Sequence, residues 1–141
     1  MNKRILILCT GNSCRSQMAE GFLKSFDRNL EVYSAGTKPA SKVNLNSVKV
    51  MDEIGIDICS QYPQDVNEFI DKPFDYVITV CDNAKEVCPV FHGVVKQQLH
   101  IPFEDPYEAT GTEEEVLAVY RKVRDEIHSR FSSFYKREIE C

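Results

Sequence analysis

The sequence CTGNSCRS, residues 9–16, directly follows the apolar run ILIL at residues 5–8 and precedes a stretch of helical periodicity at residues 17–26. Cys9 therefore leaves the end of a predicted buried strand, and five residues separate it from Arg15. The pattern is a strand, then a short loop of small and polar residues, then the start of a helix. In this arrangement the backbone N–H groups of the loop and the helix N-terminus surround one point of positive potential. The stretch predicts a parallel α/β fold with an oxyanion-binding loop.

The chemistry expected of this loop is nucleophilic attack on a tetrahedral oxyanion. We expect Cys9 to be the nucleophile, with its thiolate stabilised by the loop. The planar guanidinium of Arg15 can hold two oxygens of the anion. A nucleotide-binding P-loop is excluded, because no Lys-Ser or Lys-Thr follows a glycine here. The alternative is that Cys9 is a buried cysteine of the core. The predicted oxyanion-binding residues are Thr10, Gly11, Asn12, Ser13, Cys14, Arg15 and Ser16.

Size and charge narrow the classes of protein to consider. A chain of 141 residues is long enough for one domain, which we expect to span residues 1–141. A net charge of −5 without a basic stripe argues against nucleic acid or anionic membrane as a partner. The N-terminal apolar run is too short for a signal peptide, and six cysteines without one do not suggest a secreted disulfide framework. We expect a cytoplasmic monomer.

Strand and helix patterns alternate along the chain. Strands are expected at residues 3–8, 31–34, 76–80 and 97–101. Helices are expected at residues 17–26, 45–54 and 67–70, and after Thr112, which forms a capping-box pattern with Glu115. Ser13 and Ser16 can cap the first helix, and Leu45, Val48, Met51 and Ile54 are spaced for one buried face of the second. This order predicts a doubly wound α/β sandwich of about four parallel strands with helices on both faces.

A second pair of cysteines lies beyond the strand at residues 76–80. Cys81 follows that strand directly, so it is expected at the same sheet edge as Cys9. Cys88 ends a stretch with weak helical character. On a helix the two would be ~10 Å apart along the axis, whereas a disulfide needs Cα atoms roughly 5.5–6 Å apart. They can therefore bond only if the helix unwinds. The alternatives are a redox pair and two unrelated thiols; zinc is disfavoured, because the spacing of Cys81 and Cys88 matches no usual zinc site.

Several segments together resemble the thioredoxin-coupled arsenate reductases, which share the fold of the low-molecular-weight protein tyrosine phosphatases. The segments are CTGNSCRSQMAEG at 9–21, YSAG at 33–36, GIDI at 55–58, VCDNAKEVCP at 80–89, FEDP at 103–106 and GTEEE at 111–115. The similarity covers nearly the whole chain, and the pair Cys81 and Cys88 favours the reductases over the phosphatases. It implies arsenate as substrate, arsenic detoxification as the role, and thioredoxin or glutaredoxin as the reductant.

The resemblance also implies a role for each residue. Cys9 attacks arsenic, and Asp105 protonates the departing oxygen. Cys81 then attacks Cys9 and releases arsenite, and Cys88 attacks Cys81 to form the disulfide that thioredoxin reduces. A weak phosphatase side activity is expected of the same loop. Cys14 lies in the loop and could trap Cys9 in an unproductive disulfide.

Some members of the family bind potassium beside the loop through an Asn, a Glu, a Ser and an Asp. Asn12, Glu20 and Ser34 match that pattern, whereas Asp65 lies in a stretch one residue longer than expected. No other cofactor is expected. Two other functions remain open: a tyrosine phosphatase that hydrolyses phosphotyrosine, in which Cys81 and Cys88 are incidental, and a non-enzymatic oxyanion-binding or redox-sensing module.

Overall fold

A single parallel sheet forms the centre of the fold. The computed structural model describes residues 2–82 and 91–140. Within these ranges the strands are β1 (Arg4–Cys9), β2 (Glu31–Gly36), β3 (Phe74–Thr79) and β4 (Val95–His100), in the order β2-β1-β3-β4. All neighbouring strands are parallel, with Leu8 of β1 level with Thr79 of β3. The predicted fold class is confirmed, and each predicted strand is present within a few residues of its expected bounds.

The helices begin near the predicted positions. They are α1 (Arg15–Phe26), α2 (Leu45–Asp52) and α3 (Glu113–Phe134), which continues into the π-helical turn η3 (Tyr135–Glu140), with short 3-10 turns η1 (Val66–Glu68) and η2 (Pro106–Glu108). The capping box of Thr112 and Glu115 starts α3 as predicted. The predicted serine caps of α1 are wrong: its N-cap is Cys14, without a side-chain cap, because the hydroxyl of Ser16 contacts the sulfur of Cys9 instead.

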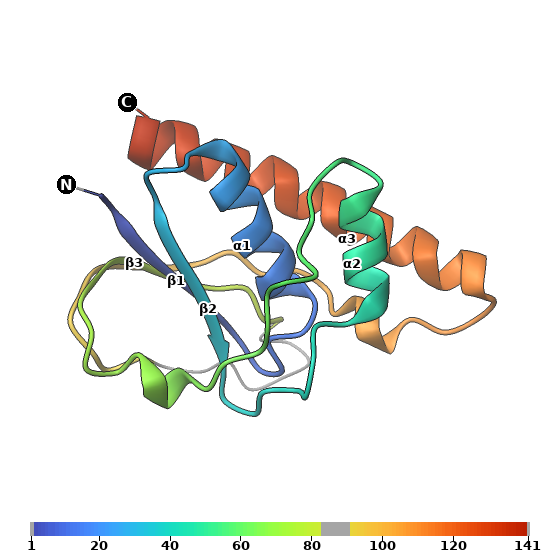
Figure 1. Ribbon diagram of the computed structural model, residues 1–141, viewed down its shortest axis with the longest axis horizontal. Helices are drawn as coiled ribbons and strands as arrows, with labels where there is room; N and C mark the ends of the chain where they lie inside the picture. The colour runs from blue at the N-terminus through green and yellow to red at the C-terminus, as the bar shows by residue number, and fades with distance from the viewer. Residues whose placement is uncertain (1, 83–90, 141) are drawn as a thin grey trace.

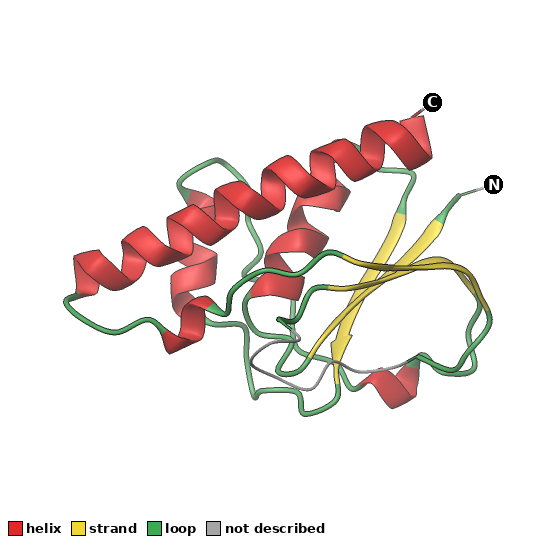
Figure 2. Cartoon of the chain, turned by 180° about the vertical axis from the view of Figure 1, so that it is seen from behind, coloured by secondary structure: helices red, strands yellow, loops and turns green. Residues whose placement is uncertain are grey.

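The side chains of β1 alternate between two cores. Ile5, Ile7 and Cys9 face the core that the three α-helices cover, whereas Leu6 and Leu8 face a smaller core with Phe69, Phe74 and Phe91. Figures 1 and 2 show α3 and α1 together over one side of the sheet, with η1 on the far side. Among the described residues, η1 and extended segments thus cover the face of the sheet opposite the three α-helices.

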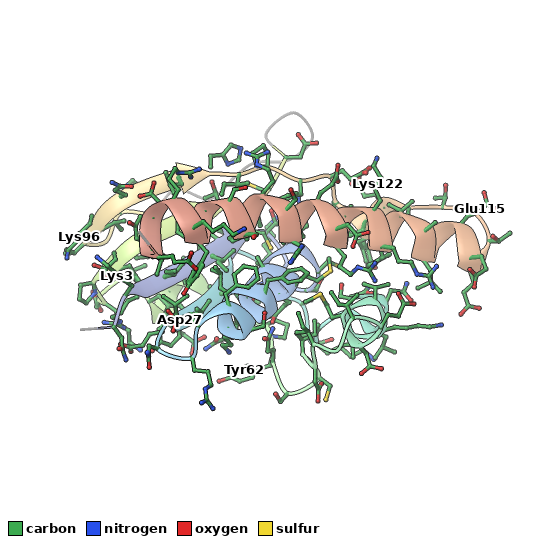
Figure 3. The ribbon with its side chains drawn as sticks, turned by 90° about the horizontal axis from the view of Figure 1, so that it is seen from above. Lys3, Asp27, Tyr62, Lys96, Glu115 and Lys122 are labelled. Carbon is green, nitrogen blue, oxygen red and sulfur yellow. The ribbon has the colours of Figure 1, made fainter. Side chains whose placement is uncertain are left out.

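Helix α3 runs the length of the molecule. In Figure 3 it extends from Glu115 at one end toward the end where Lys3 and Lys96 lie. Its residues Tyr120, Ile127 and Phe131 are buried against the main core. No helix in the described part of the chain is long and apolar enough to cross a membrane.

The predicted buried face of α2 is partly wrong. Leu45 and Ile54 are exposed, whereas Ser47, Val50 and Met51 are buried. The helix packs against α1 and α3 rather than directly on the sheet. It ends at Asp52, and Gly55, with φ of +82°, turns the chain away, so Ile54 lies beyond the helix. An eight-residue helix is too short for apolar spacing alone to choose its buried face.

Candidate active site

The candidate nucleophile lies at the carboxyl edge of the sheet. Cys9 is the last residue of β1, level with Gly36 of β2, and it is 2% exposed. The loop of residues 10–14 leads from it directly into α1. Figure 1 shows the arrowhead of β2 and the first turn of α1 at the same end of the molecule. Ligands of open α/β sheets bind at this edge.

The loop directs its carbonyl groups away from this site. The carbonyl oxygens of Thr10, Gly11 and Ser13 accept hydrogen bonds at 2.9–3.0 Å from backbone N–H groups of residues 38, 40 and 44, respectively. The carbonyl of Asn12 accepts from the side chain of Gln17. Because C=O and N–H groups of a trans peptide point in opposite directions, the N–H groups that follow these carbonyls turn to the other side. The loop therefore forms a concave array of donors, suited to a tetrahedral oxyanion.

Two donors converge on the sulfur of Cys9. The Asn12 N–H donates to Sγ at 3.1 Å, and the Ser16 Oγ lies 3.0 Å from it. The Asn12 Nδ2 donates to the same hydroxyl at 2.7 Å, which leaves the Ser16 proton free to point at the sulfur. Both donors favour the thiolate.

Burial nevertheless raises the pKa of the Cys9 thiol, against the lowering effects of Ser16, Arg15 and the Asn12 N–H. The loss of hydration on burial thus opposes the groups that stabilise the thiolate. The sequence identifies these groups but not how far the surrounding helices exclude water.

Arg15 and Asp105 meet across the site. The Arg15 guanidinium is buried; its Nη1 donates to the Phe103 carbonyl at 3.2 Å, and its Nη2 lies 3.7 Å from the Asp105 carboxylate. Asp105 also accepts from the Tyr107 N–H as the N-cap of η2. The chain thus brings the predicted anion-binding and acidic residues together from segments 90 residues apart.

A set of amides that the sequence analysis missed braces the loop. Asn12 has φ of +52°, in the left-handed region that asparagine tolerates better than most residues. Its Oδ1 accepts from the Gln64 N–H, and its carbonyl from Gln17. Gln17 in turn accepts from the side chain of Gln61. Gln17 is fully buried, so its amide requires hydrogen-bond partners, which this network supplies.

The second loop cysteine, Cys14, contacts hydroxyl groups of the loop and of α3. Cys14 is buried, with its Sγ 3.7 Å from both the Tyr120 hydroxyl and the Ser13 Oγ. Burial raises the pKa of the Cys14 thiol and also that of the Tyr120 hydroxyl. Cys14 is a free thiol, as are Cys9 and Cys59.

Cys81 lies at the predicted edge of the sheet. It follows β3, whose Thr79 is level with Leu8, so it is one step beyond the level of Cys9 on the neighbouring strand. Adjacent strands at that offset separate Cα atoms by roughly 6 Å. Cys81 is buried and disulfide-bonded. The predictions for Cys88 and for the helical stretch that precedes it concern residues 83–90, which lie outside the described residues.

The predicted potassium ligands do not form a free cation site. Ser34 donates to the Glu20 carboxylate, and the Lys24 ammonium lies 2.5 Å from its other oxygen. Asn12 directs its side chain to Ser16 and Gln64. Asp65 instead caps η1. Because a lysine already neutralises the one buried carboxylate, these residues do not fit a potassium ion as they are arranged. No group of three metal-binding side chains was found in the described ranges.

A pocket of about 760 Å³ opens above Cys9. The oxyanion loop with Arg15 lines it, together with Asp105 and Tyr107. Lys42, from the segment between β2 and α2, and Leu45, the first residue of α2, line it as well. Lys42 had no role predicted from the sequence, although two lysines in that short connection were a visible signal. Tyr107 and Leu45 are both largely exposed, so the rim of the pocket is apolar.

Comparison with known proteins agrees with this geometry. Residues 4–140 match the family described as low molecular weight phosphotyrosine protein phosphatase. A protein of Halalkalibacterium halodurans named arsenate reductase is 48% identical over 136 residues, covering 95% of this chain and 96% of its own. A solved structure of an arsenate reductase in the phosphate binding state superposes with a TM-score of 0.79 at 29% identity, covering 96% of this chain and 98% of that one.

A thioredoxin-dependent arsenate reductase of Corynebacterium glutamicum is also similar, with a TM-score of 0.67 and 26% identity, covering 96% of this chain and 61% of that one. The family model spans almost all of the sequence. The loop from Cys9 to Arg15 and Asp105 line one pocket at the edge of the parallel sheet. The chain therefore belongs to the low molecular weight phosphotyrosine protein phosphatase family.

Proposed function

We propose that this protein is a cytoplasmic arsenate reductase that uses cysteine thiols as its electron source. The observation that carries the proposal is the position of Cys81, a disulfide-bonded cysteine one strand away from the nucleophile Cys9. A hydrolase of this fold needs Cys9, Arg15 and Asp105 but no second cysteine. The names of the similar proteins support the same reaction.

The first step joins Cys9 to arsenic. Arsenate occupies the concave loop, with its oxygens on the loop N–H groups and on the Arg15 guanidinium. The Cys9 sulfur attacks arsenic, and one arsenate oxygen leaves as water. That water takes up two protons, one from Asp105 and one that the buried Cys9 thiol gives up to the bound anion. Removal of the thiol proton by the dianion overcomes the raised pKa of Cys9.

The second step reduces arsenic. The Cys81 sulfur attacks the Cys9 sulfur, the S–As bond breaks, and its electron pair stays on arsenic, which leaves as arsenite. Cys88 then displaces Cys9 from Cys81, and a dithiol protein of the thioredoxin or glutaredoxin type reduces the Cys81–Cys88 disulfide. The thioredoxin dependence named for the similar Corynebacterium protein supports thioredoxin as this partner. We expect a monomer in which no cofactor takes part in these steps.

A second candidate function is phosphotyrosine hydrolysis. The exposed side chains of Tyr107 and Leu45 at the rim of the pocket would suit an aryl group carried by the oxyanion. In that reaction water, not Cys81, resolves the adduct on Cys9. We propose it as a weak side activity of the same loop.

The test measures arsenate-dependent NADPH oxidation with thioredoxin and thioredoxin reductase. Repeated turnover by the wild type and none by Cys9→Ser is expected. Hydrolysis of p-nitrophenyl phosphate by the same preparations serves as the comparison. Fast ester hydrolysis with no arsenite formed would contradict the reductase and favour the phosphatase.

A further inference from the structure

The pocket above Cys9 contains a cation that the mechanism does not use. The charged side chains that line it are Arg15, Asp105 and Lys42. Lys42 belongs to the segment between β2 and α2, whereas Asp105 precedes η2. Among the described residues it is the one lysine that lines this pocket.

The backbone on both sides of Lys42 is fixed to the oxyanion loop. The Ala40 N–H donates to the Gly11 carbonyl at 2.9 Å, and the Asn44 N–H to the Ser13 carbonyl at 3.0 Å. Val43 is buried in the main core. The backbone around Lys42 is thus held beside the oxyanion loop, and its exposed side chain lines the pocket.

The balance of charge in the pocket depends on Lys42. Arg15 lies 3.7 Å from the carboxyl group of Asp105, the proposed proton donor. The chain as a whole carries −5 and repels anions. Lys42 therefore adds a second positive charge to the pocket lining, beside that of Arg15.

We propose that Lys42 is an oxyanion-recognition residue, which raises the affinity of the site for doubly charged tetrahedral anions and does not take part in the chemical steps. The proposal deepens the proposed function by assigning a recognition residue for arsenate. It rests on that function only for the identity of the substrate, because inorganic phosphate, a tetrahedral anion of the same charge, can probe recognition without any redox step.

The test compares Lys42→Gln with Lys38→Gln on the full-length, reduced protein. Lys38 lies on the same segment and loses the same charge, but it does not line the pocket. The readout is protection of Cys9 from iodoacetamide by increasing phosphate or arsenate, followed by mass spectrometry of the Cys9 peptide. Lys42→Arg, which keeps the charge, is the rescue variant, and circular dichroism checks that each variant folds.

Lys42→Gln is expected to weaken phosphate and arsenate binding by ~3- to 10-fold at low salt. The effect should fall below about twofold at 0.5 M NaCl, where screening is strong. In turnover, KM for arsenate should rise by a similar factor while kcat stays within about twofold. Lys38→Gln and Lys42→Arg should bind like the wild type.

Equal effects of Lys42→Gln and Lys38→Gln, or a loss confined to kcat, would overturn the proposal. So would a wild-type Cys9 that neither anion protects. Protection that depends on Lys42 in a protein that does not turn over arsenate would support the recognition role and contradict only the reductase function.

Discussion

The Oγ of Ser16 lies 3.0 Å from the Sγ of Cys9, and its own lone pair is occupied by the Nδ2 of Asn12 at 2.7 Å. Ser16 can therefore donate its own proton to the thiolate form of Cys9. Together with Arg15 and the Asn12 N–H, this hydroxyl opposes the effect of burial, which raises the pKa of Cys9. How readily the thiol reacts depends on the balance between burial and these groups.

Ser16→Ala should make Cys9 less reactive at neutral pH. Loss of a hydrogen bond to a charged group should move the pH profile of Cys9 alkylation to higher pH and slow the reaction at pH 7 by roughly tenfold. Mass spectrometry of the Cys9 peptide between pH 6 and pH 10 measures it. Ser13→Ala is the matched control, because its hydroxyl contacts Cys14 instead. An unchanged profile for Ser16→Ala would contradict the donor role.

Arg15→Lys should reduce kcat/KM for arsenate by ~10²-fold or more, because a point charge cannot replace a planar fork aimed at two oxygens. The buried position, with a bond to the Phe103 carbonyl, leaves a lysine little freedom to compensate. Steady-state kinetics check the prediction, with the exposed Arg130→Lys as control. A loss of only a few-fold would mean that Arg15 has a structural role.

Cys81→Ser and Cys88→Ser should separate the reductase from the phosphatase. Both variants should keep the weak hydrolysis of an aryl phosphate and lose catalytic turnover of arsenate. Cys81→Ser should stop at the Cys9–arsenic adduct, and Cys88→Ser should release one arsenite and stop with Cys9 joined to Cys81. Disulfide mapping and single-turnover arsenite assays distinguish these states. Repeated thioredoxin-driven turnover by either variant would rule out the proposed relay.

Gly36→Ala should destabilise the protein by distorting the oxyanion loop. A Cβ at Gly36 would lie 2.3 Å from the Thr10 carbonyl oxygen, a backbone atom that cannot move without displacing the loop. We expect a loss of about 1–3 kcal/mol in unfolding free energy, measured by urea denaturation. Gly11→Ala is the comparison, because its Cβ would meet nothing nearer than the Ser13 Oγ at 3.8 Å. Equal losses in both variants would refute the steric explanation.

Glu53→Gln should reveal a stability contribution that depends on pH. Hydrogen bonds from Arg121 and Arg124 lower the pKa of Glu53 to about 2. The folded state therefore binds fewer protons than the unfolded chain, whose Glu53 has the ordinary pKa of 4.5. The stabilisation is present above that value and is lost as the pH falls toward 2.

The free energy of unfolding, measured at several pH values, checks this prediction. The difference between wild type and Glu53→Gln should be largest near pH 7 and shrink as the solution is acidified through this window. Glu108→Gln, on the exposed turn η2, controls for the loss of one negative charge. A difference that does not change with pH would show that the ion pairs of Glu53 do not stabilise the fold.

Local sequence was enough to predict the elements whose signals are contained within a few residues. The apolar run before Cys9, the β-branched run around Ile78 and the capping box at Thr112 each specify a backbone conformation by themselves, and each predicted element is present. The oxyanion loop was predictable for the same reason: Cys9, Arg15 and Ser16 lie within eight residues, and a strand followed by a helix leaves them little choice of arrangement.

Tertiary structure decided what depends on distant segments. Leu45 is exposed because α2 packs on other helices. Lys42 and Asp105 line one pocket only because the fold brings the segment after β2 and the start of η2 to the same site. The pKa of Cys9 rises because helices from the rest of the chain exclude water from the end of β1. Short-range hydrogen bonds and side-chain periodicity depend on residues that are close in the sequence. Burial and electrostatic effects depend on all the residues around a group, and only the folded chain brings those residues together.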